Sequence, residues 1–105
     1  MIIGFGVNGQ NLASQAQEQN IPYSVIELNG KISTKYLMEG EPMYPGDARS
    51  EEVLIRAAVH KARTVVIAVH DAASAEAITI QVRKLNHHAH IIVRSQFASE
   101  VETFK

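Results

Sequence analysis

The chain begins with MIIGFGVNGQNLASQ, residues 1–15, and this stretch decides the fold class. Three apolar residues precede glycines in the order G-x-G-x-x-G, at Gly4, Gly6 and Gly9. A helical pattern follows at residues 8–19, with apolar side chains on one side. Strand, glycine turn and helix in this order are typical of a phosphate-binding turn. In such a turn Gly4 permits the tight bend, Gly6 lets the backbone approach a pyrophosphate, and Gly9 allows close packing of the helix on the strand.

A bound phosphate would lie at the start of this helix, where free backbone N–H groups and the positive end of the helix dipole favour an anion. The second element of the pattern is Glu27, near the end of a strand-like segment at residues 23–28 and 18 residues after Gly9. An acidic side chain at this distance accepts hydrogen bonds from ribose hydroxyls. Its charge also repels a 2′-phosphate, so NADP is disfavoured. In the alternative interpretation, the glycines shape only the first turn of the fold and no ligand binds.

Strand-like and helical segments alternate along the rest of the chain. Strands are expected at residues 1–3, 23–28, 42–44, 64–69 and 90–93, and helices at residues 8–19, 31–39, 51–60, 71–85 (or from 74) and from 96 onward, with Ser50 able to cap the third helix. This alternation implies parallel strands joined by right-handed crossovers. We therefore expect an α/β fold: a single domain with a Rossmann-like, doubly wound, mainly parallel sheet and helices on both faces. The segment at 64–69 has the composition of a central strand, and the segment at 90–93 is expected to be another buried strand. Pro45 places the segment at 42–44 at a sheet edge.

The composition is that of an ordinary globular domain, and it excludes several classes of function. A length of 105 residues fits one domain, and a net charge of −1 provides no basic surface for nucleic acid. The absence of cysteine excludes disulfides, thiolate nucleophiles and thiolate metal sites. No apolar run approaches the ~20 residues that a membrane-spanning helix needs. Only three residues precede Gly4, fewer than a first strand normally has, so we expect the chain to be a fragment of a longer protein.

Five segments, GFGVNGQNLA, IPYSVIELN, GEPMYPGDARSEEVL, ARTVVIAV and HIIVRS, follow one another along nearly the whole chain. Together they resemble the RCK/KTN (TrkA-N) nucleotide-binding domain, in particular the version attached to Kef-type monovalent cation/proton antiporters of bacterial membranes. The glycine turn alone is common to Rossmann folds. Its combination with Gly46-Asp47-Ala48 and with the IIVR strand is more specific. The resemblance implies that residues 1–105 are a TrkA-N domain from a longer membrane transporter.

The resemblance also implies a function and a setting. Domains of this family lie on the cytosolic side of a potassium channel or transporter, bind NAD(H), AMP, ADP or ATP, and gate transport by changing conformation. The expected partners are a transmembrane cation antiporter domain of the same polypeptide and a second copy of the domain in a homodimer, with no nucleic acid. The expected location is the cytoplasmic face of the bacterial inner membrane. No catalytic residue and no bound metal are expected.

By resemblance, the glycine turn lines the phosphates, Glu27 holds the ribose, and the residues after the third strand lie along the adenosine. The end of the fourth strand lies near the cleft. The full expected set of cofactor-binding residues is Gly4, Phe5, Gly6, Val7, Asn8, Gly9, Glu27, Leu28, Asp47, Ala48, Val69 and His70. Many family members have arginine where this chain has Val7, and an arginine there could meet a terminal phosphate. Its absence favours AMP or NAD(H) over ATP as the ligand.

Other polar residues have competing interpretations. The HHAH segment at residues 87–90 could bind a metal, but its spacing matches no strong template, and a turn between helix and strand explains it better. Asp71 either caps the next helix or forms the mouth of the cleft, and the two roles are compatible. Arg94 either contacts a phosphate or a partner subunit, or forms a salt bridge at the rim of the sheet.

Three functions remain compatible with the sequence. The first is a regulatory module, in which a nucleotide shifts a population of states that a transporter reads. The second is the cofactor-binding half of an NAD-dependent oxidoreductase. The Tyr-x-x-x-Lys pair of short-chain dehydrogenases is absent, because Glu27, Gly40 and Ala48 stand four residues after the three tyrosines. The third is an assembly module that has lost its ligand, against which the intact glycine turn and Glu27 argue.

Overall fold

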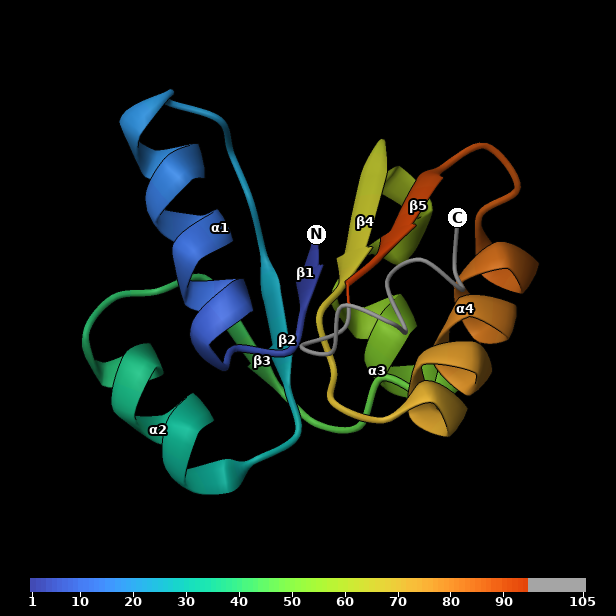
Figure 1. Cartoon of the computed structure of the whole chain (residues 1–105), viewed down its shortest axis with the longest axis horizontal. Coiled ribbons are helices and arrows are strands. Elements are labelled where there is room, and N and C mark those ends of the chain that lie inside the picture. Colours follow the sequence, from blue (N-terminus) through green and yellow to red (C-terminus); the bar gives the residue numbers. More distant parts are fainter. Residues whose placement is uncertain (95–105) are drawn as a thin grey trace.

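A parallel sheet of five strands forms the centre of the molecule (Figure 1). The structure is a computed structural model and describes residues 1–94. The elements are strands β1 (Ile2–Ile3), β2 (Val25–Glu27), β3 (Met43–Pro45), β4 (Thr64–Ile67) and β5 (His90–Val93), helices α1 (Val7–Glu18), α2 (Gly30–Met38), α3 (Glu51–Arg56) and α4 (Ala72–Leu85), and a 3-10 turn, η1 (Val59–Lys61). No helix within the described part of the chain has the length and apolar character needed to cross a lipid bilayer. The helix expected from residue 96 lies outside the described residues.

The strands follow the order β3-β2-β1-β4-β5, and all neighbouring pairs are parallel. The chain winds outward from β1 to β3, and then crosses back to place β4 on the other side of β1. Ile2 of β1 is therefore in register with Val25 of β2 on one side and with Val66 of β4 on the other. This arrangement confirms the doubly wound, Rossmann-like α/β fold, with β3 at an edge as Pro45 predicts.

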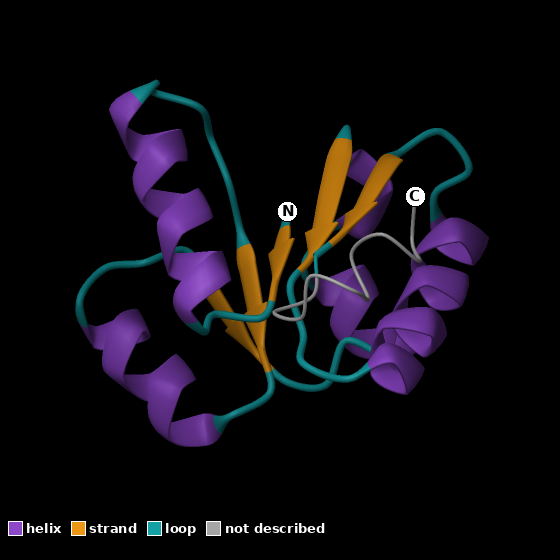
Figure 2. Ribbon diagram, in the orientation of Figure 1, coloured by secondary structure: helices purple, strands orange, loops and turns teal. Residues whose placement is uncertain are grey.

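Helices cover both faces of the sheet, with α1 and α2 on one face and α3 and α4 on the other (Figure 2). Successive strand residues point to opposite faces, so β1, β2 and β3 each contribute to two hydrophobic clusters, while β4 and β5 contribute to the larger one. Ile2 belongs to the smaller cluster, with Phe5 and Ala13. Ile3 belongs to the larger cluster, with Leu54 of α3 and Ile78 of α4. The apolar character of the strands thus follows from burial on both sides.

Glycine and asparagine set helix ends where the sequence predicts them. Helix α1 is followed by Asn20 in the left-handed region (φ 57°), and α2 is followed by Gly40 (φ 89°). Asn29 caps the start of α2, because its side-chain oxygen accepts hydrogen bonds from the backbone N–H groups of Lys31 at 2.9 Å and Ile32 at 3.1 Å. The cap fixes the loop between β2 and α2, which forms part of the candidate site.

Two expectations about the second half of the chain are wrong. The helix expected to run to His60 is interrupted, since α3 ends at Arg56 and Ala58 adopts a left-handed conformation (φ 60°) before η1. The interruption turns the chain so that Val59 is fully buried. The strand at residues 90–93 is expected to be buried, but it is only partly covered, because within residues 1–94 it pairs with β4 alone.

Candidate functional site

A cavity of about 280 Å³ opens at the carboxyl ends of the parallel strands. Its walls come from the loops that follow β1, β2, β3 and β4, together with the first turns of α2 and α4. It lies where the strand order reverses between β1 and β4. Doubly wound sheets bind their ligands at this point, because the loops after the two strands diverge there and leave a crevice.

The structure brings most of the expected residues to this cavity. Those that line it are Gly4, Phe5, Gly6, Glu27, Leu28, Asp47, Ala48, Val69 and His70. Val7, Asn8 and Gly9 do not line it and form the first turn of α1. This turn has no side-chain cap and no acidic residue, so the first N–H groups of α1 have neither an intrahelical partner nor a side-chain capping partner. An anion bound beside Gly6, which lines the cavity and directly precedes the helix, would lie near these groups.

The three glycines of the turn are held by different constraints. Gly4 has φ +100°, and a Cβ there would lie 2.3 Å from the carbonyl oxygen of Ala68. A Cβ on Gly9 would lie 2.0 Å from the carbonyl oxygen of Gly4. The packing of the protein therefore requires glycine at both positions. A Cβ on Gly6 would meet no atom within 4 Å, and its φ of −76° suits any residue. The open space beside Gly6 fits a phosphate that approaches the backbone closely.

Glu27 is buried at the edge of the cavity and joins two of its loops. One carboxylate oxygen accepts a hydrogen bond from the backbone N–H of Phe5 at 2.6 Å, and the other accepts from that of Asn29 at 2.6 Å. Only 8% of Glu27 is exposed. Each carboxylate oxygen can accept a second hydrogen bond, so the side chain keeps the capacity to hold a hydroxyl group. Its position at the end of β2 is the position that the sequence predicts.

Phe5 contributes backbone rather than a side chain to the cavity. Its ring is buried in the smaller hydrophobic cluster and meets the ring of Tyr36 edge-on, with centroids 4.8 Å apart. Its N–H is already bonded to Glu27. The glycine turn is thereby tied both to β2 and to helix α2, which fixes the position of Gly6 relative to Glu27.

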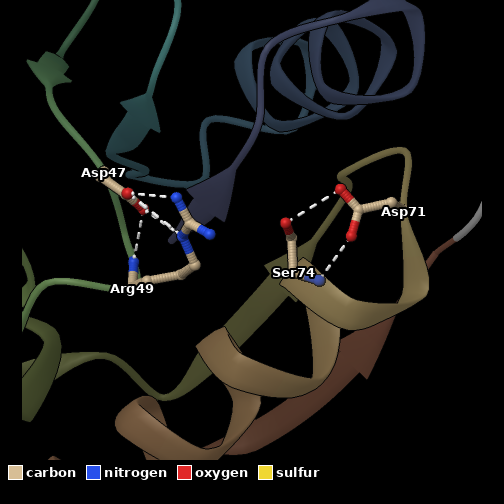
Figure 3. A network of polar contacts seen from close by, with 4 residues as sticks. All are labelled: Asp47, Arg49, Asp71 and Ser74. Atoms are coloured by element: carbon tan, nitrogen blue, oxygen red, sulfur yellow. Dashed lines mark hydrogen bonds and ion pairs between the residues drawn. The ribbon is translucent and has the colours of Figure 1, made fainter.

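The loop after β3 carries a feature that the sequence analysis missed. Arg49 lines the cavity and forms an ion pair with Asp47, in which Nη2 lies 2.8 Å from Oδ2 and Nε lies 3.1 Å from Oδ1 (Figure 3). The hydrogen bonds from Arg49 hold the pKa of Asp47 below its ordinary value. The side chain of Ala48 is buried in the core, so this residue offers mainly its backbone. A basic residue directly after Gly46-Asp47-Ala48 was the available signal.

The loop after β4 forms the opposite wall. Asp71 caps helix α4, because its carboxylate accepts hydrogen bonds from the backbone N–H of Ser74 at 2.6 Å and from the Ser74 hydroxyl at 2.9 Å (Figure 3). The backbone hydrogen bond from Ser74 is the main cause of the lowered pKa of Asp71. Asp71 also lines the cavity, so both roles left open by the sequence occur together. Ser50, in contrast, precedes α3 but makes no side-chain capping bond.

The remaining polar candidates lie away from the cavity. The histidines at residues 87–90 do not line it, and neither does Arg94, whose backbone N–H donates to the carbonyl of Ile67 at 2.8 Å. Among the described residues, no group of three or more histidine, cysteine, aspartate or glutamate side chains is placed to hold a metal ion.

Similar proteins carry the same domain within longer chains. Potassium channel protein 1 of Methanocaldococcus jannaschii is 29% identical over 105 residues, which span 97% of this chain and 31% of that protein. A putative K(+) efflux antiporter, KefB, of Alkalimonas amylolytica is 29% identical over 101 residues, which span 96% of this chain and 15% of that protein. The chain thus spans less than a third of the length of these relatives.

A solved structure and a family model extend the comparison. The crystal structure of the TrkA-N domain of the inner membrane protein ybaL from Escherichia coli matches with a TM-score of 0.86 and 25% identity, covering 96% of this chain and 75% of that one. The family model of the TrkA-N domain matches residues 1–105. Fold, cavity and family model agree, and the chain belongs to the TrkA-N domain family.

Proposed function

We propose that this domain binds an adenine nucleotide, NAD(H) or AMP, and thereby regulates a potassium or other monovalent cation transporter. The observation that carries the proposal is the open space beside Gly6, at the uncapped start of α1, within a cavity that also contains the Glu27 carboxylate. A pyrophosphate or phosphate would lie against Gly6 and the first N–H groups of α1. The ribose would bond to Glu27, and the adenosine would extend along Asp47 and Ala48.

The charges of the cavity favour a ligand with few negative charges. Among the described residues that line it, Glu27, Asp47 and Asp71 carry carboxylates, and Arg49 carries the single guanidinium. A triphosphate would add several negative charges to this surplus, whereas AMP and NAD(H) add fewer. Val7, at the start of α1, is 76% exposed and brings no compensating charge. We therefore expect the domain to bind ATP more weakly than AMP or NAD(H).

The relatives support the proposed setting. One is named a potassium channel protein and another a putative K(+) efflux antiporter, which supports a regulatory role rather than catalysis. In this role the domain lies at the cytoplasmic face of a bacterial inner membrane, joined to a transmembrane cation antiporter domain of the same polypeptide and paired with a second copy. To transmit a signal, the nucleotide must bind two states of the domain with different affinity.

Calorimetric titration of the ligand-stripped domain with AMP, ATP, NAD, NADH and NADPH tests the proposal. We expect binding of AMP or NAD(H), weaker binding of ATP and little binding of NADPH. Preference for NADPH would contradict the role of Glu27 and favour an oxidoreductase. Silence for all five nucleotides would contradict nucleotide binding altogether and leave an assembly module.

The variant Gly6→Val tests the position of the ligand. A side chain there would fill the space beside the turn, so we expect nucleotide affinity to fall roughly tenfold to hundredfold, since overpacking costs ~1–3 kcal/mol. The fold should persist, because no protein atom lies within 4 Å of the added Cβ. Gly30→Val is the matched control, since a Cβ at Gly30 also meets nothing and Gly30 does not line the cavity. Unchanged affinity in Gly6→Val would place the ligand elsewhere.

A further inference from the structure

Arg49 is the one permanent positive charge among the described residues that line the cavity. Its side chain is 53% exposed, and it extends from the loop after β3 into the space in front of the Asp71–Ser74 turn (Figure 3). Three carboxylates share the same cavity, so an anionic ligand has to find its side-chain counter-charge in Arg49. The start of α1 offers backbone N–H groups but no positive side chain, because Val7 and Asn8 stand at its first two positions.

The ion pair that holds the guanidinium of Arg49 is one that an incoming anion could displace. Nε and Nη2 of Arg49 donate hydrogen bonds to the Asp47 carboxylate, and Nη1 makes no hydrogen bond within residues 1–94. The Asp47 side chain is 35% exposed, so both partners of the pair are in contact with water. Ion pairs between exposed groups are weak, because solvent screens them and competes for their hydrogen bonds. The planar fork of arginine fits two oxygens of a phosphate as well as it fits a carboxylate.

We propose that Arg49 is the residue by which the site recognises the phosphate of its nucleotide, and that Asp47 holds the guanidinium until the phosphate replaces it. The inference rests on the proposed nucleotide binding and adds the source of its phosphate specificity. The loop after β3 thus supplies the cation that the start of α1 lacks. On exchange, the Asp47 carboxylate loses its ion-pair partner and keeps the hydrogen bond from the backbone N–H of Arg49 at 2.9 Å, so the charge of the ligand changes the contacts within this loop.

Comparison of AMP with adenosine isolates the phosphate, because the two ligands differ in that group alone. We expect the wild-type domain to bind AMP more tightly than adenosine. In Arg49→Gln the affinity for AMP should fall roughly tenfold to hundredfold, the range for loss of a charged hydrogen-bonding partner, while the affinity for adenosine stays the same. Arg56→Gln is the matched control, because Arg56 is an exposed arginine in the last turn of α3 and does not line the cavity.

The variant Asp47→Asn tests the competition between the Asp47 carboxylate and the phosphate for the Arg49 guanidinium. Loss of the carboxylate charge weakens the hold on Arg49, so the preference for AMP over adenosine should rise severalfold. The ratio of the two affinities is the readout, because Asp47 is itself expected to lie along the adenosine and its replacement can change both affinities together.

The outcomes separate this inference from the proposed function. An unchanged ratio in Arg49→Gln, or an equal loss of AMP and adenosine binding, overturns the role of Arg49 while nucleotide binding stands. An unchanged or lowered ratio in Asp47→Asn overturns the exchange. Failure of the wild-type domain to bind AMP, NAD or NADH overturns both proposals.

Discussion

Buried polar side chains at the two ends of the sheet differ in how much of their hydrogen-bonding capacity the protein itself uses. At the amino end, the amide of Asn86 donates to the carbonyls of Val59 and Ala62, and its oxygen accepts from the N–H groups of His88 and Ala89, all at 2.9 to 3.0 Å. At the carboxyl end, the Glu27 carboxylate accepts hydrogen bonds from two N–H groups and can accept more beside the cavity. Each residue is 8% exposed. Burial is therefore equal, and the unused hydrogen-bonding capacity distinguishes Glu27, the proposed binding residue, from Asn86, whose hydrogen bonds all go to the protein itself.

Arg83 reinforces the amino end in the same manner. Its Nη1 donates to the carbonyl oxygens of His87 and Ala89 at 3.1 and 2.8 Å, and so closes the turn between α4 and β5. These bonds satisfy backbone groups of the protein itself. By contrast, the guanidinium of Arg49 at the carboxyl end is paired with an exposed carboxylate and faces the cavity.

The largest loss of stability is expected at Gly9, where the backbone at the carboxyl end of the sheet is closely packed. In Gly9→Ala the added methyl would overlap the carbonyl oxygen of Gly4, 2.0 Å away, and neither backbone segment can move without shifting β1 or α1. We expect a loss of about 3 kcal/mol or more in the free energy of unfolding. Urea denaturation measures it, with Gly6→Ala as the control that should remain near wild type. Equal stability of the two variants would refute the division of the glycines into structural and ligand-facing positions.

Asn86→Ala tests the structural end directly. It removes four hydrogen bonds and leaves the carbonyl of Ala62 and the N–H groups of His88 and Ala89 without that partner, whereas the carbonyl of Val59 keeps the N–H of Ala62 at 3.1 Å. We expect a loss of about 2 kcal/mol in the free energy of unfolding. Chemical denaturation gives the value, and nucleotide affinity should not change in the folded protein. Asn11→Ala, on the exposed side of α1, is the control. A shift in affinity comparable to that of Gly6→Val would break the contrast between the two ends.

The smallest effect is expected at Asp71, which serves both the fold and the cavity. Its pKa in the folded protein is lowered from 3.8, chiefly by the backbone hydrogen bond from Ser74, so its charged form stabilises the fold. That stabilisation is present above the ordinary pKa and is lost as the pH falls through the lowered one. Asp71→Asn keeps a capping oxygen but no charge, so its small deficit at pH 7 should shrink and vanish as the pH falls through the lowered pKa of Asp71. Thermal unfolding against pH follows it, with Glu76→Gln, exposed on α4, as the control; a deficit that does not shrink as the pH is lowered would show that charge is not its cause.

The sequence predicts the features that depend on neighbouring residues along the chain. The glycine turn, the cap at Asp71 and the helix ends at Asn20 and Gly40 are local, and the structure has all of them, although the cap expected at Ser50 is not formed. Glu27 follows from its fixed spacing to the turn.

Features that depend on the path of distant segments could not be predicted. Arg49 lines the cavity together with residues of the loops after β1 and β4, which are distant in sequence, and Asn86 meets Val59 and Ala62 across 27 and 24 residues. The break after α3 was missed because alanine, not glycine, takes the left-handed conformation at Ala58.

The bridge made by Glu27 has a mechanical consequence. It joins the N–H of Phe5 after β1 to the N–H of Asn29 after β2, so one wall of the cavity is set before a ligand arrives. In the loops after β3 and β4, which form other walls of the cavity, the hydrogen bonds of the Asp47 and Asp71 side chains within residues 1–94 stay inside their own loops. The cavity thus has one wall that is preorganised by a bridge between two loops, and other walls whose loops lack such a bridge from these side chains. Binding against the preorganised wall costs little conformational entropy, and we expect a change of shape that a ligand drives to begin in the loops after β3 and β4.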